Sequence, residues 1–139
     1  MSEFSIQLYE KGRCRIQHAL ADVEIITDLP PEYGGEGKSF SSTDLVSAAL
    51  GSCLLTSIDG ILERAGHDPK KIKISVKKAL SEKPKMIKSI TVNIFYPDIL
   101  SDKLLKKLEG AMKICPVKRS LNEQIEIRTQ FFTGAKLGE

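Results

Sequence analysis

Hydrophobic and polar residues alternate with a period of two along much of the chain, which is typical of β-strands with one buried face. The alternation is strict near residues 71–77 and looser at the N-terminus. Gly, Pro and Ser clusters bound these segments, as they bound strands in general. The segments for which the pattern predicts strands are residues 4–10, 13–18, 23–27, 71–77, 86–96 and 125–132.

A long helix is predicted after the loop of residues 28–42, because Ser41 to Thr43 are good N-cap residues and Gly66 is a natural C-terminal stop. Apolar and small residues cover nearly its whole circumference from Leu45 to Leu62. Such a helix is expected to be buried on all sides. In a chain this small, a sheet or a second subunit must surround it.

Two further helices are predicted towards the C-terminus. An amphipathic pattern begins at Ser101, and a short helix is expected from Pro116 to Leu121, since proline suits the first helical position. The order is strands, helix, two strands, helix and strand. It favours an α+β fold with an antiparallel sheet wrapped around a long buried helix. Without a repeat or linker, residues 1–139 are expected to form a single domain.

Composition narrows the class of protein. The 139-residue chain has a net charge of +3, too small an excess to indicate a nucleic-acid partner, and its lysines are interpreted as solvated faces. The longest near-apolar run, Leu45 to Ile58, is shorter than the roughly 20 residues of a membrane span. No secretory signal is apparent at the N-terminus. We therefore expect a cytoplasmic protein with no membrane partner.

Three cysteines, an odd number, favour reduced thiols over a disulfide framework. Cys53 lies within the long helix among small residues that let a substrate approach its sulfur. Cys115 stands just before a predicted helix, where the helix dipole is expected to depress the pKa of its thiol. Either setting alone also fits a structural cysteine. Cys14, on a strand, is interpreted as structural.

Three segments taken together are a more specific signal than either cysteine alone. They are GGEG from Gly34, TDLVSAALGSC ending at Cys53, and CPV from Cys115. Their combination resembles the OsmC/Ohr family of osmotically inducible and organic hydroperoxide resistance proteins, in its OsmC-like branch. The resemblance implies an OsmC-like fold, an intertwined homodimer and a cysteine-based peroxidase that reduces organic hydroperoxides, and hydrogen peroxide less well. An external dithiol would be the reductant, with no cofactor.

The resemblance also implies roles for individual residues. Cys53 would be the peroxidatic thiol and Cys115 the resolving thiol, which forms a disulfide with it. Arg13 would activate the Cys53 thiolate. Arg15 is the alternate, because on a strand it shares a face with Arg13, and both also fit solvated hairpin charges.

This chain departs from the family pattern at one position. Ten residues before the reactive cysteine the family has an acidic residue that holds the arginine, and this chain has Thr43 there. Asp44 follows it. Asp44 is expected either to orient Arg13 or to complement the helix dipole.

The remaining candidates are residues that would line a substrate site: Tyr33, Phe40 and Leu54. His18 and His67 have no ligand partner at metal-binding spacing, so no metal site is expected. The alternative function is a non-enzymatic dimer of the same fold that binds a small apolar ligand or senses oxidation. A low pKa of Cys53 would favour the enzyme over this alternative.

Overall fold

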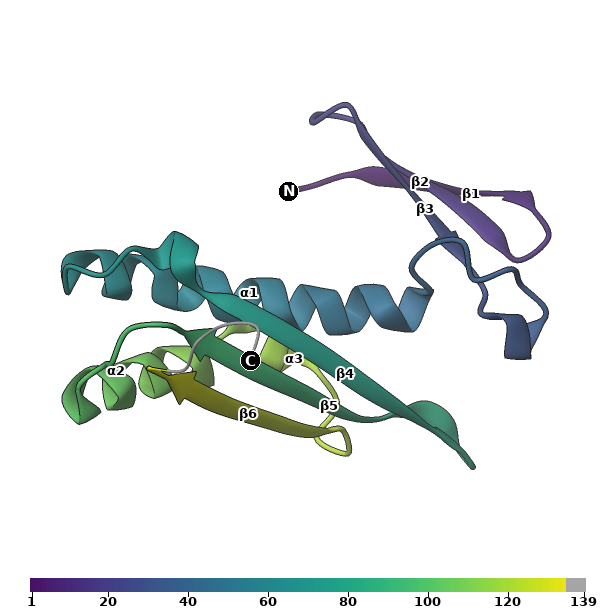
Figure 1. The fold of residues 1–139 in the computed structure, drawn as a ribbon. Helices are drawn as coiled ribbons and strands as arrows, with labels where there is room; N and C mark the ends of the chain where they lie inside the picture. Colours follow the sequence, from purple (N-terminus) through teal and green to yellow (C-terminus); the bar gives the residue numbers. More distant parts are fainter. Residues whose placement is uncertain (135–139) are drawn as a thin grey trace. The chain divides into compact units, whose positions relative to one another are not determined.

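The computed structural model describes residues 1–134, which form an α+β structure with two compact units, Met1–Val46 and the chain from Ser47 onward (Figure 1). The α+β class predicted from the pattern is confirmed. Each unit contains its own three-stranded sheet. The expectation of one domain over the whole chain stays a prediction.

The first unit is a three-stranded antiparallel sheet made of β1 (Phe4–Glu10), β2 (Arg13–His18) and β3 (Val23–Asp28). These bounds match the predicted strands within one residue. The central strand β2 places Ile16 opposite Ile6 of β1 and Ile25 of β3. The same register places Arg13 directly opposite Asp28.

The loop after β3 contains a short 3-10 helix, Pro31–Tyr33, and is pinned back onto the end of the strand. The backbone N–H of Asp28 donates to the carbonyl of Phe40 at 3.0 Å. Gly35 packs against the backbone carbonyl of Leu29 so closely that a Cβ there would lie 1.8 Å from the oxygen. Position 35 therefore accepts only glycine in this conformation.

Helix α1 spans Ser42–Arg64, close to the predicted bounds. Ser41 and Asp44 form a capping box: the Ser41 hydroxyl accepts from the Asp44 N–H at 3.1 Å, and the Asp44 carboxylate accepts from the Ser41 N–H at 2.9 Å. At the other end, Gly66 has a φ of +84° and a Schellman arrangement in which the His67 N–H donates to the Leu62 carbonyl.

The second unit contains β4 (Lys73–Glu82), β5 (Lys85–Tyr96), α2 (Asp102–Lys113), α3 (Pro116–Ser120) and β6 (Glu126–Thr133), preceded by a 3-10 turn, Pro69–Lys71. Strands β4 and β5 are antiparallel, as predicted, but β6 runs parallel to β5. The long connection through α2 and α3 returns the chain to the end of the sheet where β5 began, which permits parallel pairing.

The core of the second unit lies between this sheet and the helices (Figure 1). Alternate residues of β5 are fully buried, namely Ile90, Val92, Ile94 and Tyr96. Leu50, Leu54, Ile58 and Leu62 of α1 and Leu108 of α2 complete it. Gly51 lets α1 approach β4, because a Cβ there would lie 2.9 Å from Ile74 and 3.0 Å from Val76.

The apolar character of α1 has two further consequences. Within the chain, one stripe of α1 is buried and the side with Ala49, Ser52 and Thr56 is exposed, so burial on all sides stays a prediction that needs another covering surface. The run from Leu45 to Ile58 that the sequence analysis considered is shorter than a membrane span. The whole of α1 is long and apolar enough to cross a membrane, with a mean hydropathy of 1.7. Its leucines instead form the core with the sheet, and core helices of soluble proteins meet the same criteria.

Candidate functional site

Cys53 and Cys115 lie in contact in the second unit. Cys53 projects from α1 and is half-buried, while Cys115 is fully buried at the N-cap of α3, directly after α2. Both are free thiols. The Cys53 sulfur is near enough for the Cys115 thiol to act as a hydrogen-bond donor to the Cys53 thiolate, which lowers the pKa of Cys53. The structure thus brings together the two cysteines that the motifs singled out.

Hydrogen bonds to its sulfur depress the pKa of the Cys53 thiol. The Cys115 thiol contributes most, and the backbone N–H of Val117 and the Ser57 hydroxyl also lower the pKa of Cys53. Partial burial raises it, but the hydrogen bonds prevail. A depressed pKa increases the fraction of thiolate, which is the nucleophilic form of cysteine.

The pKa of the Cys115 thiol was expected to be depressed, and this expectation was wrong. Burial raises the pKa of its thiol, and so does its hydrogen bond to Cys53, which a neutral thiol donates. The backbone N–H groups of Lys118 and Val117 act in the expected direction but do not prevail. The sequence showed the helix start but not the complete burial of the sulfur. The pair is therefore asymmetric, with Cys53 the more acidic thiol.

Sequence reasoning missed Ser57, one helical turn after Cys53. The single proton of its hydroxyl is donated to the Cys53 carbonyl at 2.7 Å. Turned towards the sulfur instead, the same hydroxyl lowers the pKa of Cys53. A Ser four residues after a candidate nucleophile on a helix is the signal that could have found it. Val117 acts through its backbone N–H, for which no side-chain signal exists.

A second cluster of charged groups lies in the first unit, around Arg13 at the start of β2. The Arg13 guanidinium donates to Glu10 at 3.1 Å and forms an ion pair with Asp28, with 3.7 Å between Nε and Oδ2. The Glu10 hydrogen bond is the main cause of a raised pKa of Arg13. Tyr9 lies beneath the guanidinium, 6.0 Å away.

Asp28 was not identified from the sequence, although it is the one buried charged residue among residues 1–134. Its Oδ2 accepts from the backbone N–H of Lys38 at 3.0 Å. That bond, the Glu36 N–H and the charge of Arg13 hold the pKa of Asp28 below its usual value despite burial. Counting the β2–β3 hairpin outward from its turn pairs positions 13 and 28, a signal that was available.

Arg15 shares the face of Arg13, as expected, and its guanidinium lies 5.1 Å from the Tyr9 ring. It forms a 3.2 Å ion pair with Glu24 of β3. The structure describes the two units separately, so the predicted action of either arginine on Cys53 stays a prediction.

The other predicted site residues occupy different parts of the fold. Asp44 caps α1, which supports the helix-terminus interpretation of this residue; a role in orienting Arg13 stays a prediction. Leu54 is fully buried in the core, Tyr33 ends the 3-10 turn of the loop, and Phe40 is 60% exposed. Contact of these three side chains with a substrate stays a prediction.

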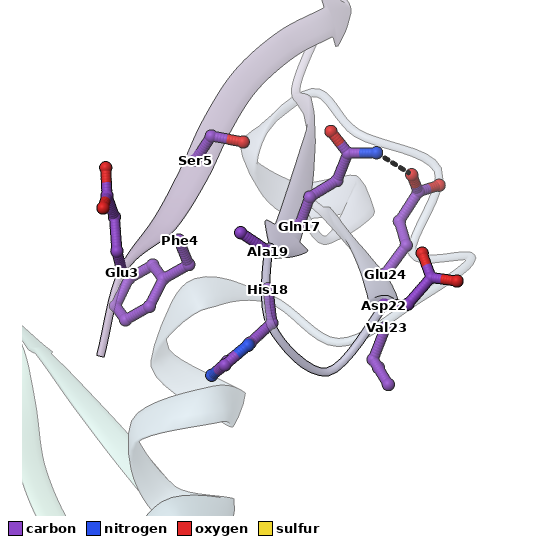
Figure 2. A pocket seen from close by; sticks show the side chains of 9 residues that line it. All are labelled: Glu3, Phe4, Ser5, Gln17, His18, Ala19, Asp22, Val23 and Glu24. Atoms are coloured by element: carbon purple, nitrogen blue, oxygen red, sulfur yellow. Dashed lines mark hydrogen bonds between the residues drawn. The ribbon is translucent and has the colours of Figure 1, made fainter. Parts of the chain in front are cut away.

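One pocket of the first unit lies at the end of the sheet near the β2–β3 turn (Figure 2). It has a volume of about 470 Å³ and includes Phe4, His18 and Val23. Gln17 donates to Glu24 at its rim (Figure 2). Within residues 1–134, no cluster of three or more acidic, His or Cys side chains is arranged to hold a metal ion.

An α+β fold with two thiols in contact, one of them activated, defines a class of thiol redox proteins. The family whose model is described as OsmC-like protein matches residues 35–130, more than half of the chain. The chain belongs to this family, as the motifs around Cys53 and Cys115 predicted. Proteins of this fold include some that are named for organic hydroperoxide resistance. No curated protein matches the chain significantly.

Solved structures agree with this assignment. A protein of Psychrobacter arcticus 273-4 assigned to the osmotic stress and detoxification response is 27% identical, with a TM-score of 0.89 over 95% of this chain and 96% of its own. The organic hydroperoxide resistance protein OsmC of Legionella pneumophila is 13% identical, with a TM-score of 0.72, over 94% and 96%. OhrB of Bacillus subtilis is 12% identical, with a TM-score of 0.68, over 95% and 98%. The last two support the fold alone.

Proposed function

We propose that this protein is a thiol-dependent peroxidase that reduces organic hydroperoxides, with Cys53 as the peroxidatic thiol and Cys115 as the resolving thiol. The hydrogen bond between the two sulfurs carries the proposal, because it depresses the pKa of Cys53 and raises that of Cys115. A nucleophile that ionises readily beside a thiol that stays protonated is the arrangement that such a reaction needs.

In the first step the Cys53 thiolate attacks the terminal peroxide oxygen, the O–O bond breaks, and the alkoxide takes a proton to leave as an alcohol. Cys53 is thereby oxidised to a sulfenic acid. In the second step the Cys115 sulfur attacks the Cys53 sulfur, and hydroxide leaves with the Cys115 proton as water. An external dithiol then reduces the disulfide and is itself oxidised to a disulfide.

The proposal includes partners and surroundings. Arg13, or Arg15 as the alternate, stabilises the Cys53 thiolate, and hydrocarbon substituents of the peroxide favour binding beside the apolar residues of α1. The protein acts as an intertwined homodimer, which would cover the exposed side of α1. Three free thiols suit a reducing compartment, so we place the activity in the cytoplasm.

The test is consumption of cumene hydroperoxide by the reduced protein, followed by intact-mass analysis. We expect one equivalent of peroxide to be consumed with a loss of about two mass units as the disulfide forms. Cys53→Ser is expected to abolish consumption. Cys115→Ser should still consume peroxide, but Cys53 should gain one oxygen and then over-oxidise on repeated exposure.

Cys14→Ser is the matched control, since it removes the thiol of the first unit and is expected to leave both consumption and mass change intact. Full consumption by Cys53→Ser contradicts the mechanism. Normal recycling by Cys115→Ser shows that Cys115 is not the resolving thiol.

A further inference from the structure

We propose that the hydroxyl of Ser57 is a further catalytic group, one that changes its hydrogen-bond acceptor with the charge of Cys53. It donates to the backbone carbonyl of Cys53 while the thiol is protonated, and to the Cys53 sulfur once the thiol has ionised. This inference deepens the proposed function and rests on it. The residues that carry it all belong to the second unit.

Ser57 lies on α1 four residues after Cys53, so the two side chains are neighbours on one face of the helix. Both residues are half-buried, which limits the competition from water. A short bond of 2.7 Å to the Cys53 carbonyl holds the Ser57 hydroxyl oxygen beside the sulfur. From this position only the hydroxyl hydrogen has to rotate, since it turns towards whichever acceptor binds it best.

The Cys53 carbonyl has more donors than it needs. The Thr56 hydroxyl also donates to it at 3.2 Å, and lies equally far from the Ser52 carbonyl. Within α1 the Cys53 carbonyl also accepts the helical hydrogen bond from the backbone N–H four residues later. A carbonyl oxygen has two lone pairs, so two of these three donors satisfy it. The Ser57 hydroxyl can therefore turn away without leaving the carbonyl unsatisfied.

The charge of the sulfur determines which acceptor the Ser57 hydroxyl prefers. A neutral thiol is a weak acceptor, so the carbonyl keeps the hydroxyl while Cys53 is protonated. A hydrogen bond to an ionised acceptor is roughly twice as strong as one between neutral groups, which favours the sulfur after ionisation. The effect on acidity has the same direction, because the Ser57 hydroxyl lowers the pKa of Cys53.

Ser57 differs from Cys115, the other side chain that donates to the Cys53 sulfur. In the proposed cycle the Cys115 proton leaves when the disulfide forms, and the Cys115 sulfur becomes part of the new bond. The Ser57 hydroxyl is not consumed in either step. It therefore stays available as a donor when the disulfide is reduced and the Cys53 thiolate forms again.

The test compares Ser57→Ala with Thr56→Ala. Both variants remove one hydroxyl from the Cys53 carbonyl, but only the Ser57 hydroxyl also acts on the sulfur. The measurement is the pH midpoint of Cys53 alkylation by iodoacetamide in the reduced protein, read by peptide mass spectrometry. We expect Ser57→Ala to raise the midpoint by about one pH unit, the effect of losing a hydrogen bond to a charged group. Thr56→Ala should stay close to wild type, and Ser57→Thr, which keeps a hydroxyl, should restore part of the wild-type midpoint.

A second measurement tests the exchange of acceptors itself. In isotopically labelled protein, the NMR chemical shift of the Cys53 carbonyl carbon should change through the alkylation midpoint as the Ser57 hydroxyl turns away. The change should be smaller in Ser57→Ala, where only the ionisation of the sulfur acts on the carbonyl. An equal change in wild type and Ser57→Ala overturns the exchange.

An unchanged midpoint in Ser57→Ala overturns the inference. Equal rises in Ser57→Ala and Thr56→Ala overturn it too, since they would arise from the helix rather than from contact with the sulfur. Alkylation requires no peroxide, so a wild type that consumes none would refute the proposed function while Ser57 is still tested. Alanine suits a helix interior, so both variants are expected to fold. Should Ser57→Ala fail to fold, Ser57→Val and Thr56→Val give the same comparison.

Discussion

Replacing Gly51 by Ala tests the close approach of α1 to β4, two residues before the candidate nucleophile. A Cβ at this position would lie 2.9 Å from the Cδ1 of Ile74 and 3.0 Å from the Cγ2 of Val76. Carbon atoms prefer separations of about 3.5–4.0 Å, so each contact is too short by roughly 0.5–1 Å. Either the two strand residues or the helix must move.

Two effects of the substitution oppose each other. Alanine favours a helix interior over glycine by about 1 kcal/mol. Overpacking a core by one methyl group costs about 1–3 kcal/mol. We therefore expect Gly51→Ala to lower the free energy of unfolding by about 0–2 kcal/mol, the difference between these two effects.

Gly110→Ala is the matched control, because Gly110 lies inside α2 and nothing is within 4 Å of the position of its added Cβ. It is expected to stabilise by about 1 kcal/mol, so urea unfolding should separate the two variants by about 1–3 kcal/mol. Equal stabilisation by both substitutions would show that α1 and β4 are not in close contact at Gly51, and would refute the reasoning.

Two further predictions concern the core and the thiol pair. Leu54→Ala should reduce the free energy of unfolding by about 2–5 kcal/mol, measured by urea denaturation, because Leu54 is fully buried; a changed KM with unchanged stability would instead support a substrate-lining role. Cys115→Ala should raise the pH midpoint of Cys53 alkylation, because the hydrogen bond from Cys115 is the largest cause of the low pKa of Cys53. Cys115→Ser should raise the midpoint less, since its hydroxyl still donates a hydrogen bond. Equal midpoints in the two variants would contradict this assignment.

Local pattern predicted most of the secondary structure of this protein. Alternation located the strands, although β4 spans Lys73–Glu82 rather than the predicted residues 71–77. Residues at the helix starts and stops located the helices: Ser41 with Gly66 for α1, Ser101 for α2 and Pro116 for α3. These signals are local because each depends on neighbours within one turn or one strand. They do not specify how strands pair, which is why the parallel partnership of β5 and β6 was not foreseen.

The candidate site was predictable only in part, for the same physical reason. The motifs identified Cys53 and Cys115 as a pair, but which thiol is the more acidic depends on burial and hydrogen bonds from distant segments. Ser57 and the backbone of Val117 contribute through the same contacts. Asp28 was overlooked because its burial arises from the loop folding back over the end of β3.

The raised pKa of Cys115 suits the role of a resolving thiol in the proposed cycle. Before peroxide binds, the Cys115 thiol is protonated, and its S–H group donates to the Cys53 thiolate and stabilises it. Once Cys53 is a sulfenic acid, that proton is needed by the departing hydroxide, and the sulfur left behind attacks. The thiol therefore loses its proton in the step that forms the disulfide, and an earlier ionisation would remove the donor on which the reactivity of Cys53 depends.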